Sequence, residues 1–351
     1  MNLILKTSTY FLFFLCVISS IFRSTIYSIS FFIEIVYIFI SLFIILNMRL
    51  NKYLFYTSCL ILFILIISYY KFGLTSYLIM SKNLITCIFS IIIFSKFKIS
   101  LRILTNLCGV MLLYYLIEFT TGYGFKSIFV MSNEYWNQTS RLTGLFSNYH
   151  YSAFIYCLLM FLFFFKKTYI LFVLYPFLIL SGVYTSIIAF TAAIPLIILK
   201  RLSIYKINTF ITFFIIGAFP LILFYGESII ENVFHFPKKN SLVALLQSLI
   251  NIDFVIFFNF LPSDFHFFLE NRNVEQSLFL RFFSDVGYFS HLYQYGIIFF
   301  LILIIYFFKF PLFFLYVCLS LFHNCYFFDP LAIAIVSSVS SNLNSFQINH
   351  A

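Results

Sequence analysis

The stretch ISFFIEIVYIFISLFIILN, residues 29–47, decides the class of fold. It carries a single charge, Glu34, and has the length and apolar character of a helix that crosses a lipid bilayer. The rest of the chain follows the same pattern, because 63% of its 351 residues are hydrophobic, only 9% are charged and the mean hydropathy is +1.05. A soluble domain carries about a quarter charged residues, so a water-soluble protein is excluded.

Apolar runs of helical length recur along the whole chain. Short alternating segments, which a membrane β-barrel would show, are absent. We therefore expect an all-α, polytopic integral membrane protein with a single membrane domain over residues 1–351. About twelve transmembrane helices are predicted, near residues 10–22, 29–47, 53–70, 77–95, 101–121, 149–165, 168–184, 186–199, 207–225, 286–308, 310–322 and 328–341.

The basic residues indicate how the chain is oriented. If the N-terminus is cytoplasmic, twelve of the 21 Lys and Arg residues lie in or before short connections on the cytoplasmic side. The opposite short connections carry little more than Arg23 and Lys71. This positive-inside distribution predicts a cytoplasmic N-terminus. The first apolar run is not followed by a small-residue cleavage site, so an uncleaved first helix is expected. The distribution of basic residues also explains most of the net charge of +10 without a nucleic-acid partner.

Two longer polar segments then lie on the outer side, at residues 122–148 and 226–285. The second is too long for a simple connection, so we expect it to be functional, with helices on the membrane surface or folded over the bundle. Most acidic residues fall in these two segments. Glu34 lies within a predicted helix, as does Lys82, and Glu118 lies near the outer end of another.

Arg141 is the first candidate site residue. It lies on the outer side in NQTSRLTGLFSNYHYSAF, residues 137–154, close to Gly144 and Asn148, which permit tight turns. Ser147 or Asn148 is expected to cap the helix that follows. A guanidinium beside a helix N-terminus suits an anion such as a lipid-linked phosphate or pyrophosphate. The simpler interpretation, an interfacial arginine that reaches lipid phosphates, stays open.

A second group of candidates lies around and after the end of the large outer loop. Arg272 and Arg281 are nine positions apart, so on a continuous helix they would lie on opposite faces and would form one clamp only across a break. Asp285 is either a general base or only the cap of the next helix. His291 and His323, near the outer ends of late helices, are the other candidate bases. No metal site is expected, because no His pair has metal-ligand spacing and no CxxC pair occurs.

Two of these segments resemble bacterial O-antigen polymerases and ligases. SRLTGLFSNYHYSAF, residues 140–154, resembles the Arg-x-x-Gly-x-Phe-x-Asn segment that opens a transmembrane helix in that family. SDVGYFSHLYQYGIIFFLIL, residues 284–303, resembles the segment that follows the family's large periplasmic loop. The resemblance spans residues 137–310 and implies a many-helix membrane protein with a cytoplasmic N-terminus and one large periplasmic loop late in the chain.

The resemblance implies a polysaccharide polymerase of the bacterial inner membrane that joins oligosaccharide repeat units carried on undecaprenyl pyrophosphate at the periplasmic face. The two outer segments, 122–148 and 226–285, would then be periplasmic. The implied partners are this lipid-linked oligosaccharide, the bilayer and a chain-length regulator membrane protein, and no cofactor is implied. A ligase that transfers the polymer to lipid A–core, and a flippase or transporter of the same lipid-linked oligosaccharide, are the alternatives. Tyr184 and Thr185 stand where the family often has an arginine, and Ser284 and Asp285 stand where many ligases have His-Asn, which favours the polymerase.

Overall fold

The computed structural model describes residues 2–23, 26–48, 56, 58–64, 74–121, 142–146, 148–166, 168–183, 186–187, 190–191, 295–296, 298–299, 301–303 and 328–348. The regular elements within these ranges are helices, and no strand occurs among them. The helices predicted at 207–225 and 310–322 and the large loop at 226–285 lie outside the described residues. The helices predicted at 53–70, 186–199 and 286–308 lie largely outside them.

Four of the described helices contain stretches long and apolar enough to cross a membrane. These stretches are Ile4–Arg23, Ser28–Leu46, Tyr77–Lys96 and Leu101–Thr121. The described chain is thus all-helical with several candidate spans, as in a multi-pass membrane protein, and the total of about twelve stays a prediction. The main helices are α1 (Asn2–Arg23), α2 (Tyr27–Leu46), α4 (Leu74–Lys96), α5 (Leu101–Thr121), α7 (Tyr149–Lys166), α8 (Thr168–Leu180) and α17 (Pro330–Ile348).

Three helix boundaries differ from the predicted ones by four residues or more. α17 continues to Ile348 rather than ending at 341, and the differences in α1 and α8 have local reasons. α1 begins at Asn2 rather than near residue 10, because Lys6 is exposed and does not interrupt the helix. α8 ends at Leu180 rather than 184, because Gly182 adopts a positive φ of 67°. Its N–H bonds the carbonyl of Ile179, which closes the last turn in the left-handed conformation that often terminates helices.

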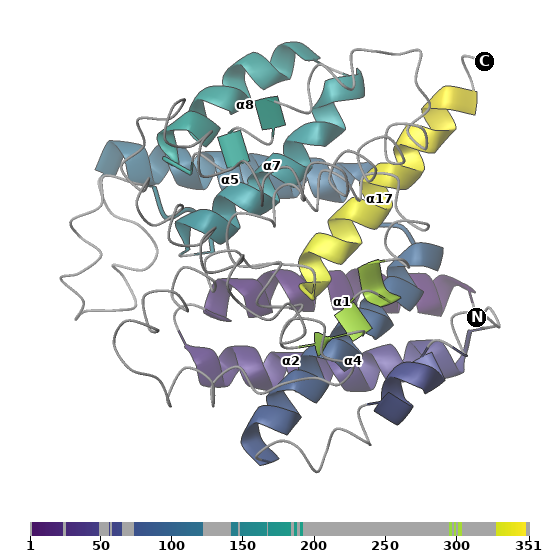
Figure 1. Ribbon diagram of the computed structural model, residues 1–351. Coiled ribbons are helices and arrows are strands. Elements are labelled where there is room, and N and C mark those ends of the chain that lie inside the picture. The colour runs from purple at the N-terminus through teal and green to yellow at the C-terminus, as the bar shows by residue number, and fades with distance from the viewer. Residues whose placement is uncertain are drawn as a thin grey trace, which may run out of the picture. The chain divides into compact units, whose positions relative to one another are not determined.

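The chain divides into two units. The first consists of Met1–Tyr56, Lys82–Pro195 and Tyr326–Ala351, and the second consists of Thr57–Ser81 and Leu196–Cys325. Within the first unit α1 packs along α2, α7 packs along α8, and α17 contacts α1, α5 and α7 (Figure 1). The last helix of the chain therefore joins helices from the beginning and the middle of the sequence.

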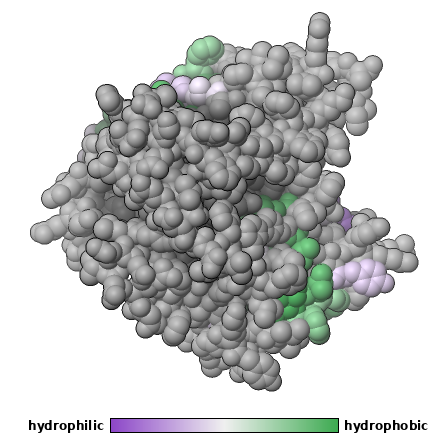
Figure 2. Space-filling model, viewed as in Figure 1, coloured by the Kyte–Doolittle hydropathy of each residue, from purple (hydrophilic) through white to green (hydrophobic). Residues whose placement is uncertain are grey.

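α7 and α17 form the core of the first unit. Residues 151–161 of α7 and 331–340 of α17 are buried on every side, which is the pattern of a helix surrounded by other helices. α5 instead buries one face and exposes Leu113 and Phe119 on another. Exposed apolar side chains of this kind suit contact with lipid, and the described residues on the face in Figure 2 are mostly hydrophobic.

Candidate functional site

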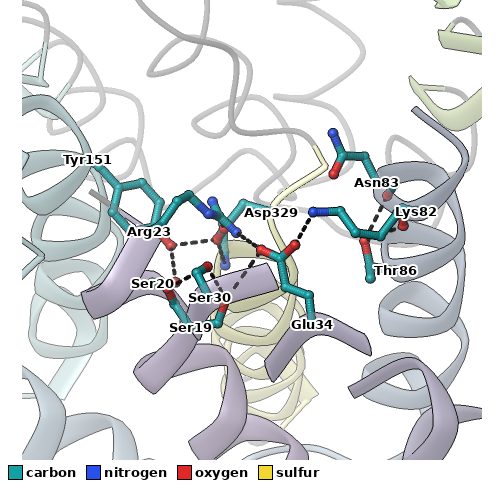
Figure 3. Close-up of polar contacts among 11 residues, drawn as sticks. Ser19, Ser20, Arg23, Ser30, Glu34, Lys82, Asn83, Thr86, Tyr151 and Asp329 are labelled. Atoms are coloured by element: carbon teal, nitrogen blue, oxygen red, sulfur yellow. Dashed lines mark hydrogen bonds and ion pairs between the residues drawn. The ribbon is translucent and has the colours of Figure 1, made fainter. Parts of the chain in front are cut away.

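Arg23, the last residue of α1, lies at the centre of a network of charged side chains (Figure 3). Its Nη1 donates a hydrogen bond to Oδ1 of Asp329 at 3.0 Å, and its Nη2 donates to Oε1 of Glu34 at 3.2 Å. Lys82 donates to the other carboxylate oxygen of Glu34. Two cations thus face two carboxylates, and the network has no net charge.

The two carboxylates are buried, and their oxygens are occupied. The side chains of Asp329 and Glu34 are only 2% and 10% exposed, whereas that of Arg23 is 38% exposed. Charges inside a membrane are costly unless they are paired, and such pairing is the arrangement found here. Because their oxygens already accept hydrogen bonds, Glu34 and Asp329 orient Arg23 and Lys82 and are poorly suited to act as general bases.

Asp329 also joins the network to two core helices. It lies immediately before α17, and its Oδ2 accepts a hydrogen bond from the backbone N–H of Ala332 at 2.8 Å, which caps that helix. The same oxygen accepts a hydrogen bond from the hydroxyl of Tyr151 in α7, also at 2.8 Å. Arg23 lies over the ring of Tyr151, with Cζ 5.9 Å from the ring centroid. One carboxylate therefore connects α1, α7 and α17.

Serine hydroxyls extend the network between α1 and α2. Ser19 donates to Oε1 of Glu34 at 3.2 Å and lies 3.0 Å from the hydroxyl of Ser30. Ser20 lies 2.9 Å from the hydroxyl of Tyr151. The network is consequently continuous from Lys82 in α4 to Tyr151 in α7 (Figure 3).

The network lies toward the helix ends rather than midway along the spans. Arg23 ends α1, Asp329 precedes α17, and Tyr151 is in the first turn of α7. Glu34 lies seven positions after the start of α2, which is roughly 10 Å along the helix axis at 1.5 Å per residue. These ends are the ones that the positive-inside distribution assigns to the outer side.

A second polar site surrounds the turn before α7. Glu118, near the end of α5, is only 6% exposed and accepts three hydrogen bonds from this turn. Its Oε1 accepts from the N–H and the hydroxyl of Thr143, both at 2.7 Å, and its Oε2 accepts from the N–H of Gly144 at 2.8 Å. A carboxylate suits this place, since it accepts hydrogen bonds through both oxygens and donates none.

Ser152 holds the same turn from α7. Its hydroxyl donates to the carbonyl of Thr143 at 2.8 Å and accepts from the N–H of Phe146 at 3.2 Å. Gly144 adopts a positive φ of 68°, and a Cβ there would lie 2.7 Å from Cβ of Ser152 and 2.9 Å from the ring of Tyr115. The turn is therefore tightly determined by its neighbours.

Of the sequence-predicted site residues, the structure describes Gly144 and Asn148. Gly144 forms the expected tight turn, and Asn148 caps α7 by accepting a hydrogen bond from the N–H of Tyr151 at 3.1 Å. The N–H groups of Thr143 and Gly144 already bind Glu118, so these two donors are used within the protein. A role of either predicted residue in substrate binding stays a prediction. Arg141, Arg272, Arg281, Asp285, His291 and His323 lie outside the described residues.

Arg23, Glu118 and Asp329 are not among the site residues predicted from the sequence. The sequence does contain one indication of buried polar sites. Glu34 and Glu118 are isolated acidic residues within apolar helices, and such residues usually have polar partners. The identity of those partners was not accessible, since Asp329 is 306 positions from Arg23 and Glu118 is 26 positions from Gly144.

Comparison with known proteins identifies no matching family model, no similar curated protein and no similar solved structure. The fold therefore defines only a broad class: an all-helical protein in which the described residues form four candidate membrane-spanning helices and a buried polar network near helix ends.

Proposed function

We propose that the protein is a polysaccharide polymerase that acts at the periplasmic face of the bacterial inner membrane. The observation that carries this proposal is the turn at residues 143–146, which Glu118 and Ser152 hold at the start of α7. The turn belongs to the segment that resembles the Arg-x-x-Gly-x-Phe-x-Asn motif of O-antigen polymerases and ligases. Its ordered backbone, two residues after Arg141, suits a segment that presents an arginine to an anionic substrate.

The proposed reaction transfers a growing glycan from undecaprenyl pyrophosphate to a hydroxyl at the non-reducing end of the next lipid-linked unit. The bond between the anomeric carbon and the pyrophosphate oxygen breaks, a glycosidic bond forms, and undecaprenyl pyrophosphate leaves. The acceptor hydroxyl loses its proton to a base, for which Asp285, His291 and His323 are the candidates.

Arginines stabilise the charge that develops on the leaving pyrophosphate, a role assigned here to Arg141, with Arg272 and Arg281 on the pyrophosphate or the sugar. The lipid-linked donor already carries a good leaving group, so the reaction proceeds without nucleotide or redox cofactor. A ligase would use the same donor and differs in its acceptor, lipid A–core.

The second candidate is a flippase or transporter of the same lipid-linked oligosaccharide. The buried charges are the reason to consider it, because intramembrane charges commonly mark transport pathways. The geometry of the charged network disfavours a transporter. The network is neutral, internally paired and displaced toward the helix ends, and it consists of Arg23, Glu34, Lys82 and Asp329. Transport sites usually lie near the bilayer midplane.

A deletion strain distinguishes these functions when its surface polysaccharide is separated on a gel. Loss of a polymerase leaves core that bears a single repeat unit and removes the ladder of longer chains. Loss of all core-attached repeats would contradict the polymerase and indicate the ligase or the flippase. Complementation with an Arg141→Ala variant at normal protein level should not restore the ladder, whereas a full ladder would refute the assignment of Arg141.

A further inference from the structure

We propose that Arg23 forms a further binding site, which takes the phosphate group of a membrane lipid at the end of α1. The site consists of the guanidinium of Arg23 and of the two carboxylates that hold it, those of Glu34 and Asp329 (Figure 3). The inference goes beyond the proposed function, and it holds whether or not the protein joins oligosaccharide units.

The first argument is the uneven exposure of the charges in the network. The side chain of Arg23 is 38% exposed, whereas those of Glu34 and Lys82 are each 10% exposed and that of Asp329 is 2% exposed. The network is neutral as a whole, but the charge that is accessible from outside is that of the guanidinium. An accessible cation above buried carboxylates attracts an anion, because the near charge acts over a shorter distance than the charges beneath it.

The second argument is that the guanidinium is held in one orientation. Its Nη1 donates to Asp329 at 3.0 Å and its Nη2 donates to Glu34 at 3.2 Å. Asp329 is fixed in turn by the N–H of Ala332 and the hydroxyl of Tyr151, both at 2.8 Å. A guanidinium has five N–H groups, and these two contacts use one on each terminal nitrogen.

An arginine that is already ordered loses little conformational entropy when it binds a ligand. An interfacial arginine that only extends toward the headgroups has no such supports and must be ordered by each contact that it makes. The two carboxylates therefore distinguish Arg23 from an ordinary arginine at the membrane surface.

The third argument concerns the ligand. A guanidinium is suited to phosphate, which it binds through parallel, charge-assisted hydrogen bonds. Arg23 is the last residue of α1 and of the candidate span Ile4–Arg23, so it lies near the level of the lipid headgroups rather than in the hydrocarbon. Phospholipids and polyprenyl phosphates both present a phosphate at this level, and the experiment below separates them.

Footprinting of the wild-type chain tests the site at the level of one residue. The full chain is purified in a non-ionic detergent and treated with phenylglyoxal, which modifies accessible guanidinium groups, and the modification of each arginine is followed by mass spectrometry. The reaction is repeated with undecaprenyl phosphate, with dioleoyl phosphatidylglycerol, and with undecaprenol and dioleoylglycerol, which lack the phosphate. We expect near-saturating phosphate lipid to slow the modification of Arg23 about fivefold or more, and the phosphate-free lipids to leave it unchanged.

Arg102 is the internal control, because it is exposed in the first turn of α5 and is modified in the same molecules. Its rate should stay the same with every lipid. Protection by undecaprenyl phosphate alone, by phosphatidylglycerol alone or by both supports the site and identifies the source of the phosphate. Equal protection of Arg102, protection by the phosphate-free lipids, or an Arg23 that does not react or is not protected would overturn the inference.

A pair of matched variants tests the same site through binding. The bound fraction of each phosphate lipid is measured by native mass spectrometry for Arg23→Gln and Arg102→Gln. Arg23→Gln should lower it about fivefold or more, and Arg102→Gln should change it less than about twofold. Equal losses would show an interfacial arginine only. If Arg23→Gln does not fold, the footprint of the wild-type chain decides. Neither measurement follows polymer formation, so a failure of the proposed function leaves this test unaffected.

Discussion

Gly144 has a backbone conformation that side-chain-bearing residues rarely adopt. Its φ of 68° lies in the left-handed region, and its Cα faces Ser152 and Tyr115 at a distance too short for a methyl group. The family-like segment therefore requires glycine here for a steric reason that is independent of catalysis.

Gly144→Ala should destabilise the protein by about 2 kcal/mol or more, because left-handed strain adds to overpacking against Ser152. Thermal unfolding of the detergent-purified variant measures this loss. Gly109→Ala in α5 is the control, since a Cβ there meets nothing within 4 Å. It should leave stability unchanged or raise it by up to about 1 kcal/mol. Equal unfolding temperatures for the two variants would contradict the explanation.

At the scale of elements, the described helices are joined by polar contacts as well as by apolar packing. Apolar side chains gain little from meeting one another when the alternative is lipid, so hydrogen bonds and ion pairs select which helices associate. The network of Arg23, Glu34, Lys82 and Asp329 supplies such contacts between α1, α2, α4 and α17. Its neutrality means that removing one member leaves an unbalanced charge.

Glu34→Gln and Lys82→Met should each cost about 1–3 kcal/mol of stability, because each breaks the ion pair between these two residues and leaves the buried network with an unbalanced charge. The double variant should cost less than the sum of the two, since it leaves Arg23 paired with Asp329 and the network neutral. Unfolding of the purified variants by a denaturing detergent measures this. Thr86→Val is the control in α4, because the Thr86 hydroxyl donates, among the described residues, to carbonyls of its own helix. Additive losses would show that the pair is not coupled.

At the scale of the whole molecule, the contact between Tyr151 and Asp329 constrains the topology. It brings the start of α7 next to the start of α17, so a transmembrane arrangement with both starts on one side requires an even number of predicted crossings between them. Six helices are predicted from residue 149 to residue 322, which meets this requirement. The contacts of Arg23 with Asp329 and Glu34 assign the end of α1 and the start of α2 to the same side.

The orientation can be tested with alkaline phosphatase fusions, since this reporter is active only in the periplasm. A fusion after Thr121, at the end of α5, should be active, whereas one after Phe97, between α4 and α5, should be inactive. The reason is the concentration of Lys96, Lys98 and Arg102 around that connection. The opposite pattern would invert the chain and place the network on the cytoplasmic side.

The sequence by itself determined the class of protein and the local geometry before α7. Lipid offers no hydrogen bonds to the backbone, so long apolar runs specify helices, and Gly144 and Asn148 specify a turn and a cap through contacts within a few residues. The tertiary structure alone decided the partners of Glu118, Arg23 and Asp329. The physical reason is that uniformly apolar helices carry little information about which neighbour they pack against, whereas a buried charge is satisfied only after distant segments meet.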